Sequence, residues 1–418
     1  MNDTLNTEKK ILGWGKYEFA VLWMFFLVWG LVFLDRLVMA FTAPMVIPDL
    51  GITDEQFGWI MSATTGAYAI SAIFLTPILE STGKRKKWFV LMCLGAGIFA
   101  CLGAATQEVW QLLVTRAAVG FFEGPIAPLI FAMLLKESSS KRVALNAGIV
   151  NMGVAVVAIA IGSPVVTRIA VETGSWRNSF LVAGLVSIIC SLVLIGVLKK
   201  DEPLKSDEKR EPMLVSLGKL LKYRNVVVCF ILGMLCMIIY WTQMNYSTRY
   251  FTEVANNPLE GAGVIVGIMG VVSIVWTVVV PKVSDFMGRK GALIMWFALC
   301  AIAPFIMYSM PDAPAAMIMY ALFGGLAGSI FPFFQAIIPG ETIPNYMLGV
   351  ASGLIIGVGE FVGGSVWIAF TGYIADASGL PTVVLAGAIA AVAAVIVTFF
   401  LEETKGKKDE VQDMALKG

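Results

Sequence analysis

Twelve long apolar segments constrain this chain of 418 residues more than any other feature. A segment of roughly 20 apolar residues is the length that an α-helix needs to cross the hydrocarbon core of a bilayer. A helix also satisfies its backbone hydrogen bonds internally, as a lipid environment requires. We therefore expect spans at 17–47, 55–82, 87–106, 109–135, 142–170, 177–198, 225–253, 259–284, 291–310, 314–338, 345–374 and 380–401.

Composition agrees with an integral membrane protein, because 58% of the residues are hydrophobic and only 14% are charged. The first span is too long, and has the wrong flanks, to be a cleaved signal peptide. All six cysteines lie within predicted spans without metal or redox spacing, so we expect no metal and no cofactor. The sequence also shows no phosphate loop and no nucleophile cluster. We therefore do not expect an enzyme or a nucleic-acid-binding protein.

The distribution of lysine and arginine predicts the orientation of the chain. Of the 30 basic residues, Arg36 and Arg116 lie inside predicted spans. With the N-terminus in the cytoplasm, 25 of the others fall on the cytoplasmic side. Only Arg168, Arg177 and Arg249 then face outward. This bias follows the positive-inside rule, and it predicts a multi-pass protein of the plasma (inner) membrane with both termini in the cytoplasm.

Two sequence matches indicate an internal duplication. "LESTGKRK" at 79–86 matches "SDFMGRKG" at 284–291 at an offset of 205 residues. "GFFEGPIAP" at 120–128 matches "GGLAGSIFP" at 324–332 at an offset of 204. Because each match links corresponding spans of the two halves, the two nearly equal offsets favour a repeat of six spans.

The repeat predicts an all-α integral membrane fold of twelve helices in two six-helix halves. We expect the halves at 1–198 and 225–418, joined by a cytoplasmic linker at 199–224 that is rich in charge. Parallel repeats of this kind place a binding site near the midplane, between the halves, and suggest transport by rocking of one half against the other. We expect the chain to act as a monomer.

Five charged residues lie well inside the predicted spans, namely Asp35, Arg36, Arg116, Glu123 and Glu360. Burying such a charge at the bilayer centre costs about 2.5–3.5 kcal/mol on insertion scales. We therefore expect these side chains to face the protein interior and to pair with one another.

Arg116 and Glu123 lie seven residues apart in one span, so they share a helix face. They are separated by roughly 10 Å along the axis, which is too far for a direct bond. Asp35 and Arg36 of the first span are therefore their natural partners.

Comparison of the two halves of the repeat distinguishes the charged residues from the glycines and proline around them. Arg116 corresponds to Tyr320 and Glu123 to Ala327, whereas the glycines and the proline around them recur. The glycines are therefore requirements of helix packing, and the charges are an addition. The alternative is a buried ion network that only fixes the packing of helices.

The chemistry of these residues points to anions and protons. Arginine binds carboxylate or phosphate through two parallel hydrogen bonds. The chain has no histidine, so buried carboxyls are the remaining groups able to titrate near neutral pH. A fixed positive charge beside protonatable acids is typical of proton-coupled anion transport.

The loops after the second and eighth spans resemble those of the major facilitator superfamily, which also has twelve spans and a central linker. The second loop, "SDFMGRK", keeps the family's acidic, glycine and basic positions, whereas the first has glutamate and serine where aspartate and arginine are usual. Such loops lock one face through acid–base pairs, and simple charge anchoring is the alternative for the first. The resemblance implies gating by Glu80, Gly83, Lys84, Asp285, Gly288 and Arg289.

The intramembrane charges also resemble those of the anion:cation symporter branch, which includes sugar-acid transporters for galactonate and hexuronates, sialin and the vesicular glutamate transporters. The resemblance implies that Arg36 binds the anion. It further implies that Asp35 and Glu123 carry protons, that Arg116 orients Glu123, and that Tyr68 lines the cavity.

Glu360 departs from that branch, which often has asparagine in a Gly-Asn pair at this position. A third buried acid in the second half changes the electrostatics of the cavity. Glu360 is therefore a candidate to bind a second proton, or a hydroxyl or amine of the substrate.

The seventh span supplies the other wall in "YWTQMNYSTRYF". Tyr240 and Gln243 lie three residues apart, with Trp241 as an apolar wall, and both are candidates to read substrate oxygens. Gln243 is equally compatible with a hydrogen bond between helices. We interpret Arg249 and Tyr250, nearer the end of the span, as interfacial anchors.

The sequence therefore predicts a secondary transporter that moves a small organic anion, such as a sugar acid or an aromatic acid, together with protons. Its partners are the anion, protons and the lipid bilayer. One alternative is an anion exchanger without net proton movement. Another is a transporter of amines or zwitterions that uses Glu360 and the aromatic residues. A membrane sensor with the same fold is a further alternative.

Overall fold

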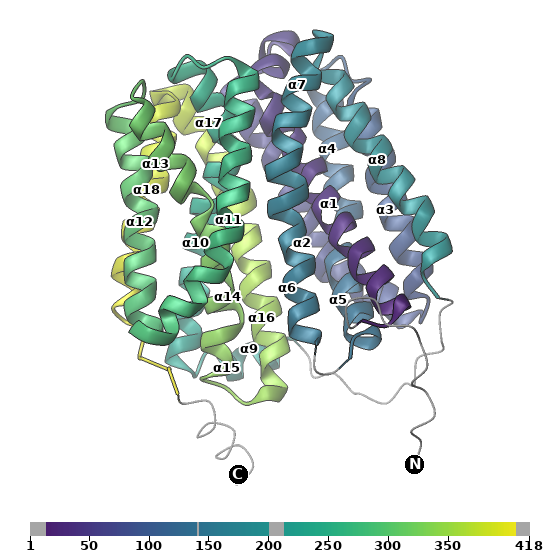
Figure 1. Cartoon of the computed structure of the whole chain (residues 1–418), viewed down its shortest axis with the longest axis vertical. Helices are drawn as coiled ribbons and strands as arrows, with labels where there is room; N and C mark the ends of the chain where they lie inside the picture. The colour runs from purple at the N-terminus through teal and green to yellow at the C-terminus, as the bar shows by residue number, and fades with distance from the viewer. Residues whose placement is uncertain (1–13, 140–141, 200–212, 407–418) are drawn as a thin grey trace.

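The computed structural model is nearly all helical and describes residues 14–139, 142–199 and 213–406 (Figure 1). The first group of helices comprises α1 (Lys16–Leu50), α2 (Asp54–Ser81), α3 (Arg85–Gly103), α4 (Val109–Glu123), α5 (Ile126–Glu137), α6 (Val143–Gly153), η1 (Val154–Gly162), α7 (Ser163–Thr173) and α8 (Trp176–Val197). The rest comprises α9 (Met213–Leu220), α10 (Arg224–Arg249), η2 (Tyr250–Val254), α11 (Leu259–Met287), α12 (Arg289–Ser309), α13 (Pro314–Gly324), α14 (Leu326–Pro332), η3 (Phe333–Ile337), α15 (Ile338–Gly340), α16 (Asn345–Gly359), η4 (Glu360–Val366), α17 (Trp367–Ser378) and α18 (Leu380–Thr398).

Twelve helical runs in the described part of the chain are long and apolar enough to cross a membrane, which confirms the predicted spans. The predicted ends lie within several residues of the observed ones. Four runs contain a π-helical stretch, η1, η2, η3 or η4, that the sequence did not predict. Such stretches are rare and often occur at functional sites.

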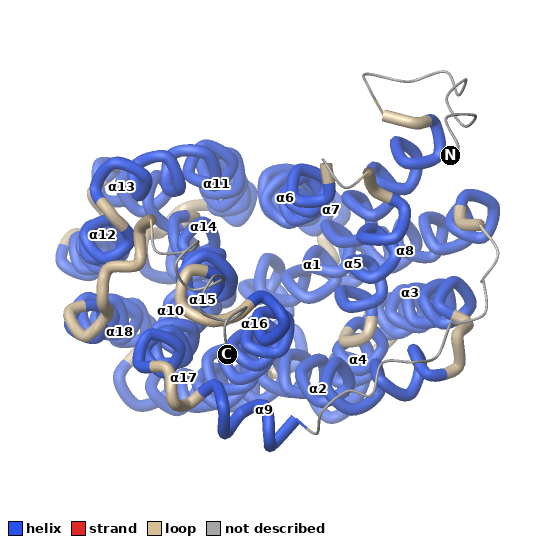
Figure 2. The backbone as a smooth tube through the Cα atoms, turned by 90° about the horizontal axis from the view of Figure 1, so that it is seen from below, coloured by secondary structure: helices blue, strands red, loops and turns tan. Residues whose placement is uncertain are grey.

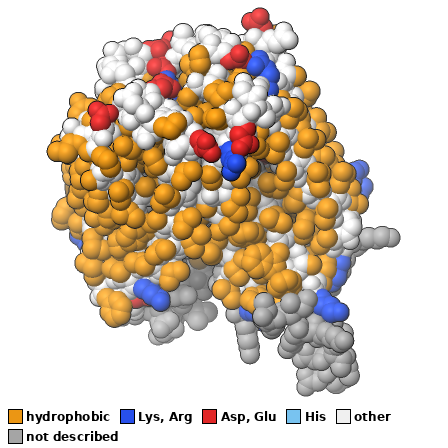
Figure 3. All heavy atoms as spheres, turned by 45° about the horizontal axis from the view of Figure 1, so that its top comes forward, with side chains coloured by type: hydrophobic (Ala, Val, Ile, Leu, Met, Phe, Trp, Pro, Cys, Tyr) orange, Lys and Arg blue, Asp and Glu red, His pale blue; other side chains and the backbone are white. Residues whose placement is uncertain are grey.

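The flank of the molecule is apolar, as a bilayer requires. Figure 3 shows hydrophobic side chains spread over this flank, with many of the charged side chains above and below. Large apolar side chains such as Phe74 and Trp110 are 68% and 64% exposed. In a soluble protein so much exposed apolar surface would cause aggregation, so this surface fits contact with lipid.

The helices form two groups side by side, α1–α8 and α10–α18 (Figure 2). The short helix α9 lies within the predicted linker 199–224, of which residues 200–212 lie outside the described part. The described chain begins before α1 and ends after α18 at the same end of the bundle, which we call the termini end (Figure 1). The predicted terminal segments 1–13 and 407–418 also lie outside the described residues.

Hydrogen bonds join the two groups at the other end, where α2 begins and α17 ends. The backbone N–H groups of Asp54 and Glu55 donate to the carboxylate of Asp376 at 3.0 and 2.9 Å. At the same end, the Ser163 hydroxyl donates to the Gly263 carbonyl at 3.0 Å. These contacts hold the two groups together at the end opposite the termini.

Close packing within the first group explains its glycine positions. A Cβ atom at Gly120 would collide with the Thr64 carbonyl, and one at Gly124 would collide with Ser71. Small residues of this kind let the backbones of α4 and α2 approach each other. In the second group, Gly328 corresponds to Gly124, but its added Cβ would meet Tyr240 at an ordinary 3.5 Å.

Candidate functional site

The charges of α1 and α4 meet at the centre of the first group. Arg36 and Asp35 are neighbours on α1, so they point in directions about 100° apart. The Arg36 Nε donates to Glu123 Oε2 at 3.1 Å, and both side chains are buried. Arg116 Nη1 donates to the backbone carbonyl of Asp35 at 2.7 Å. The structure therefore pairs Arg36 with Glu123, whereas Arg116 contacts the main chain of Asp35 and not its carboxylate.

The Arg36 guanidinium lies in an aromatic enclosure with free hydrogen-bond donors. Its Cζ atom is 3.6 Å from the centre of the Tyr68 ring, 5.3 Å from Phe33 and 5.5 Å from Trp241. The terminal Nη1 and Nη2 atoms are buried and have no protein partner. An unpaired buried donor costs free energy, so a ligand that supplies acceptor oxygens there gains affinity. Two such donors in one plane fit a carboxylate.

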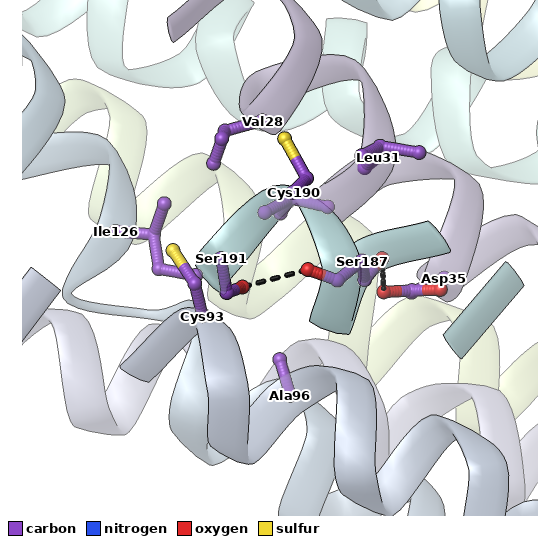
Figure 4. Close-up of a pocket in the computed structure, with 10 residues that line it drawn as sticks. Val28, Leu31, Asp35, Cys93, Ala96, Ile126, Ser187, Cys190 and Ser191 are labelled. Atoms are coloured by element: carbon purple, nitrogen blue, oxygen red, sulfur yellow. Dashed lines mark hydrogen bonds between the residues drawn. The ribbon is translucent and has the colours of Figure 1, made fainter. Parts of the chain in front are cut away.

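Asp35 faces away from this enclosure, toward α8. Its Oδ2 accepts a hydrogen bond from the Ser187 hydroxyl at 2.7 Å, as Figure 4 shows, and its Oδ1 has no partner. The sequence did not predict Ser187, because one serine in an apolar span carries no signal of what it contacts. Asp35 is thus buried with only part of its hydrogen-bonding capacity used.

A small cavity beside Asp35 lies inside the first group and not between the groups (Figure 4). Its lining is mostly apolar, with Val28, Leu31, Ala96 and Ile126 among its residues. An apolar lining does not suit an organic anion, which needs hydrogen-bond donors. The Arg36 enclosure is therefore the stronger candidate for an anion site.

Glu123 and Arg116 are both fully buried on α4, yet neither fills all its hydrogen-bonding positions. Glu123 Oε1 and Arg116 Nε and Nη2 have no partner. The hydrogen bond that Glu123 accepts comes from Arg36, and no hydrogen bond joins these two described α4 side chains. The implied role of Arg116 in orienting Glu123 stays a prediction.

Residues of α10 and η4 form the facing wall. The Trp241 indole N–H donates to Glu360 Oε2 at 3.1 Å, and its ring stacks parallel to that of Phe33 with centres 6.2 Å apart. Tyr240 packs edge-on against Trp241 at 5.4 Å. Gln243 is buried, with both amide atoms unpartnered. The predicted residues of the first, second, seventh and eleventh spans thus converge around Trp241. Gln243 is the exception, because no hydrogen bond of its side chain links it to this group.

Arg249 and Tyr250 correct the sequence interpretation. Both are buried, whereas we expected interfacial anchors. Arg249 forms ion pairs with Asp54 of α2 and with Glu253, and the Tyr250 hydroxyl donates to the Met307 carbonyl at 3.0 Å. Arg249 therefore joins the two groups at the end opposite the termini, because a buried guanidinium needs paired carboxylates.

The first predicted gating loop has a long ion pair, with Arg85 Nη2 3.9 Å from Glu80 Oε1. Lys84 precedes α3, and its backbone N–H donates to the Thr82 hydroxyl at 3.3 Å. Gly83 has a positive φ of 70°, so a glycine is favoured there by backbone geometry alone.

The second loop is more extensively bonded. Arg289 pairs with Asp285 at 2.7 Å and with Glu341 at 2.8 Å. Glu403 accepts the Arg289 and Lys290 backbone N–H groups at 2.8 and 3.1 Å. Partial burial raises the pKa of Glu403, but hydrogen bonds from four backbone N–H groups outweigh it and leave the pKa below its usual 4.5. These groups belong to Lys405, Arg289, Lys290 and Thr404.

Gly288 within that loop has φ 85° and ψ 165°, a combination essentially restricted to glycine. The sequence did not identify Glu341 or Glu403, because both join the loop from distant segments. The structure thus shows acid–base contacts in both loops, and their gating role stays a prediction.

The sequence matches the Major Facilitator Superfamily over residues 24–368, most of the chain. The chain belongs to the major facilitator superfamily. Its fold agrees with this membership, because the structure of a bacterial homologue of the human lysosomal transporter Spinster, in an inward-facing and unoccupied conformation, superposes with a TM-score of 0.74. That comparison covers 96% of this chain and 98% of the other at 15% identity, so it supports the fold alone.

Two bacterial proteins that resemble this chain are named for different activities. A D-galactonate transporter of Escherichia coli O6:H1 is 22% identical over 94% of this chain and 97% of its own length. The multidrug resistance protein MdtG of Proteus mirabilis is 25% identical over 80% of this chain and 88% of its own. The chain is therefore a membrane transporter of the superfamily with sugar-acid transporters among its relatives.

Proposed function

We propose that this protein is a secondary transporter that moves a small organic anion together with protons by alternating access. The observation that carries the proposal is Arg36, a buried guanidinium whose two terminal nitrogens have no protein partner. A carboxylate is the ligand that this pair of donors fits best. The likeness to a D-galactonate transporter along nearly the whole chain supports a sugar acid.

Proton coupling is proposed from the acids around Arg36. Glu123 touches the guanidinium directly, and Asp35 lies next to it in sequence. A carboxylate substrate that approaches Arg36 competes with Glu123 for its positive charge, which favours protonation of Glu123 when the anion binds. This competition links the binding of the anion to the uptake of a proton. An exchanger would use the same arginine, and net proton movement distinguishes the two.

The remaining assignments follow from the same scheme. The groups 1–198 and 225–418 rock against each other around the central site, with 199–224 as the linker. The termini face the cytoplasm of a cell whose inner membrane holds the protein as a monomer. The loops after α2 and α11 act in gating, through Glu80, Gly83 and Lys84 in the first and Asp285, Gly288 and Arg289 in the second.

A ligand screen by thermal shift tests the anion proposal. The detergent-solubilised full chain is heated with sugar acids, aromatic acids, dicarboxylates and amines. A ligand that binds the folded state raises the melting temperature, with a gain of about 2.7 kcal/mol at one hundred times its Kd. We expect carboxylates to stabilise the protein and amines without a carboxylate not to. Stabilisation by such amines alone would overturn the proposal.

A further inference from the structure

Glu360 is a buried carboxylate in the facing wall that the proposed anion site does not use. It is 7% exposed and begins η4, the π-helical stretch that follows α16. Its Oε2 accepts a single hydrogen bond from the Trp241 indole at 3.1 Å. A buried carboxylate has about four acceptor positions, so one neutral donor leaves it largely unsatisfied.

No lysine or arginine among the described residues approaches Glu360 within ion-pair distance. Arg36, the cation of the central site, is engaged by Glu123 at 3.1 Å and by the Tyr68 ring. The Trp241 ring lies 5.5 Å from the Arg36 Cζ, and its indole N–H donates to Glu360. The arginine and the acid therefore both lie against the same indole ring.

The charges at the centre of the molecule do not balance. Three acids and two arginines are buried there, so the cluster carries an excess negative charge when all are ionised (Asp35, Glu123, Glu360, Arg36 and Arg116). A bound anion adds to this excess. A substrate that brings a donor group to Glu360 offsets part of the cost, because hydrogen bonds to a charged group are stronger than neutral ones.

We propose that Glu360 selects, among carboxylates, those that carry a hydroxyl or ammonium group at the end remote from the carboxylate. The inference rests on the proposed function, because it places the carboxylate at Arg36. The donor group then binds the free acceptor positions of Glu360, and the substrate lies along the Trp241 ring. Glu360 is thus a specificity-determining residue in this site.

Matched acids that differ only in the terminal group test the inference. Butyrate, γ-hydroxybutyrate and γ-aminobutyrate, with their valerate counterparts, are titrated into the purified full chain, and butylamine serves as the amine without a carboxylate. We expect the acids with a terminal hydroxyl or ammonium group to bind at least about ten-fold more tightly than butyrate or valerate. A hydrogen bond to a charged group has an energy of this size.

Variants of Glu360 then assign the preference to this residue. Glu360→Ala should bind all the acids alike, whereas Glu360→Gln should keep part of the preference for hydroxyl and lose that for ammonium. Melting temperatures of both variants confirm folding. A hydroxyl preference without an ammonium preference, or the reverse, identifies which donor the natural substrate carries.

The outcomes separate the inference from the proposed function. If all the acids bind equally in the wild type and in Glu360→Ala, the inference is overturned while anion binding stands. If the variants change the number of protons moved per substrate but not the preference, Glu360 is a proton carrier and the inference is also overturned. If butylamine binds as well as the acids, the proposed function itself fails.

Discussion

The fourth span and its equivalent in the repeat, α4 in the first half and α13 with α14 in the second, use different chemistry on a related scaffold. In α4, Arg116 and Glu123 carry buried charges that contact α1. In the second half, Tyr320 accepts a hydrogen bond from the Ser247 hydroxyl at 3.2 Å, and Ala327 stands where Glu123 would be. The equivalent positions of the second half are therefore neutral.

Helix packing at these positions does not require the charges. The second half folds into a comparable bundle without them, and burial of ions costs more than burial of neutral residues. The first half therefore keeps its charges for a reason other than packing, which supports anion binding and proton coupling there. Variants that exchange features between the halves test this reading.

Loss of the proposed anion ligand should have the largest effect. Arg36→Ala removes both free donors and should abolish binding of the acid, a loss of about 2–5 kcal/mol or more. Arg36→Lys keeps the charge but not the planar pair of donors, and it should weaken binding strongly. Isothermal titration of the purified variants measures both effects.

Stability is the control for that experiment. Arg36→Ala leaves Glu123 buried without its ion pair, which destabilises the protein by about 3–5 kcal/mol. The double variant Arg36→Ala/Glu123→Gln should recover the melting temperature but not the binding. Normal binding by either alanine variant would show that Arg36 is not the anion ligand.

Exchanging the acid between the halves should separate coupling from packing. Glu123→Gln keeps the shape and a carbonyl acceptor for Arg36, so it should bind anion and exchange labelled for unlabelled substrate. It should fail to accumulate substrate against a gradient, because it releases no proton. Ala327→Glu places an acid where no cation is paired, and it should mainly lower the melting temperature.

Transport assays on one preparation decide between the two roles of Glu123. If exchange and accumulation fall together with the melting temperature, Glu123 only neutralises a neighbouring arginine. A stable Glu123→Gln protein that still concentrates substrate would remove the residue from the proton path.

The repeated glycines should differ in their tolerance of a methyl group. Gly124→Ala would drive a Cβ into the Ser71 hydroxyl and the Tyr68 carbonyl and should cost about 1–3 kcal/mol of stability. Gly328→Ala meets only the Tyr240 ring at 3.5 Å and should be nearly neutral. Thermal melting compares the two directly, and equal costs would show that the halves pack more alike than these contacts indicate.

The smallest effect is expected at the loop of the second half. Glu403→Gln loses the ionised acceptor that binds the Arg289 and Lys290 backbone N–H groups. Because folding lowers the pKa of Glu403 below 4.5, its stabilisation is fully present above that pH and is lost as pH falls through the folded pKa. The variant should melt slightly lower than wild type at neutral pH, and the difference should disappear in acid. A difference independent of pH would contradict the role of the carboxylate.

Much of the fold was predictable from the sequence, because spans depend on local composition and length. Pairing between the first and fourth spans was also predictable, since Arg116 and Glu123 are too far apart on one helix to bond. The cost of buried charge then required partners such as Arg36.

Contacts between distant segments were not predictable in the same way. Examples are the contacts of Ser187 and Glu341 and the ion pair between Asp54 and Arg249. They depend on how the helices cross and on which side-chain rotamers result. The prediction for Arg249 was wrong because an arginine near the end of a span is expected at the membrane interface. Its burial follows from carboxylates that α2 and η2 bring to it.

Proton-driven accumulation in proteoliposomes measures whether this protein couples movement of an organic anion to that of protons. Purified wild-type protein is reconstituted, an inward proton gradient is imposed, and labelled D-galactonate or the best acid of the ligand screen is added outside. We expect accumulation above the external concentration that a protonophore abolishes, and Asp35→Asn should lose the dependence on external pH. Uptake that ignores the gradient but rises when anion is loaded inside would contradict proton symport and indicate an exchanger.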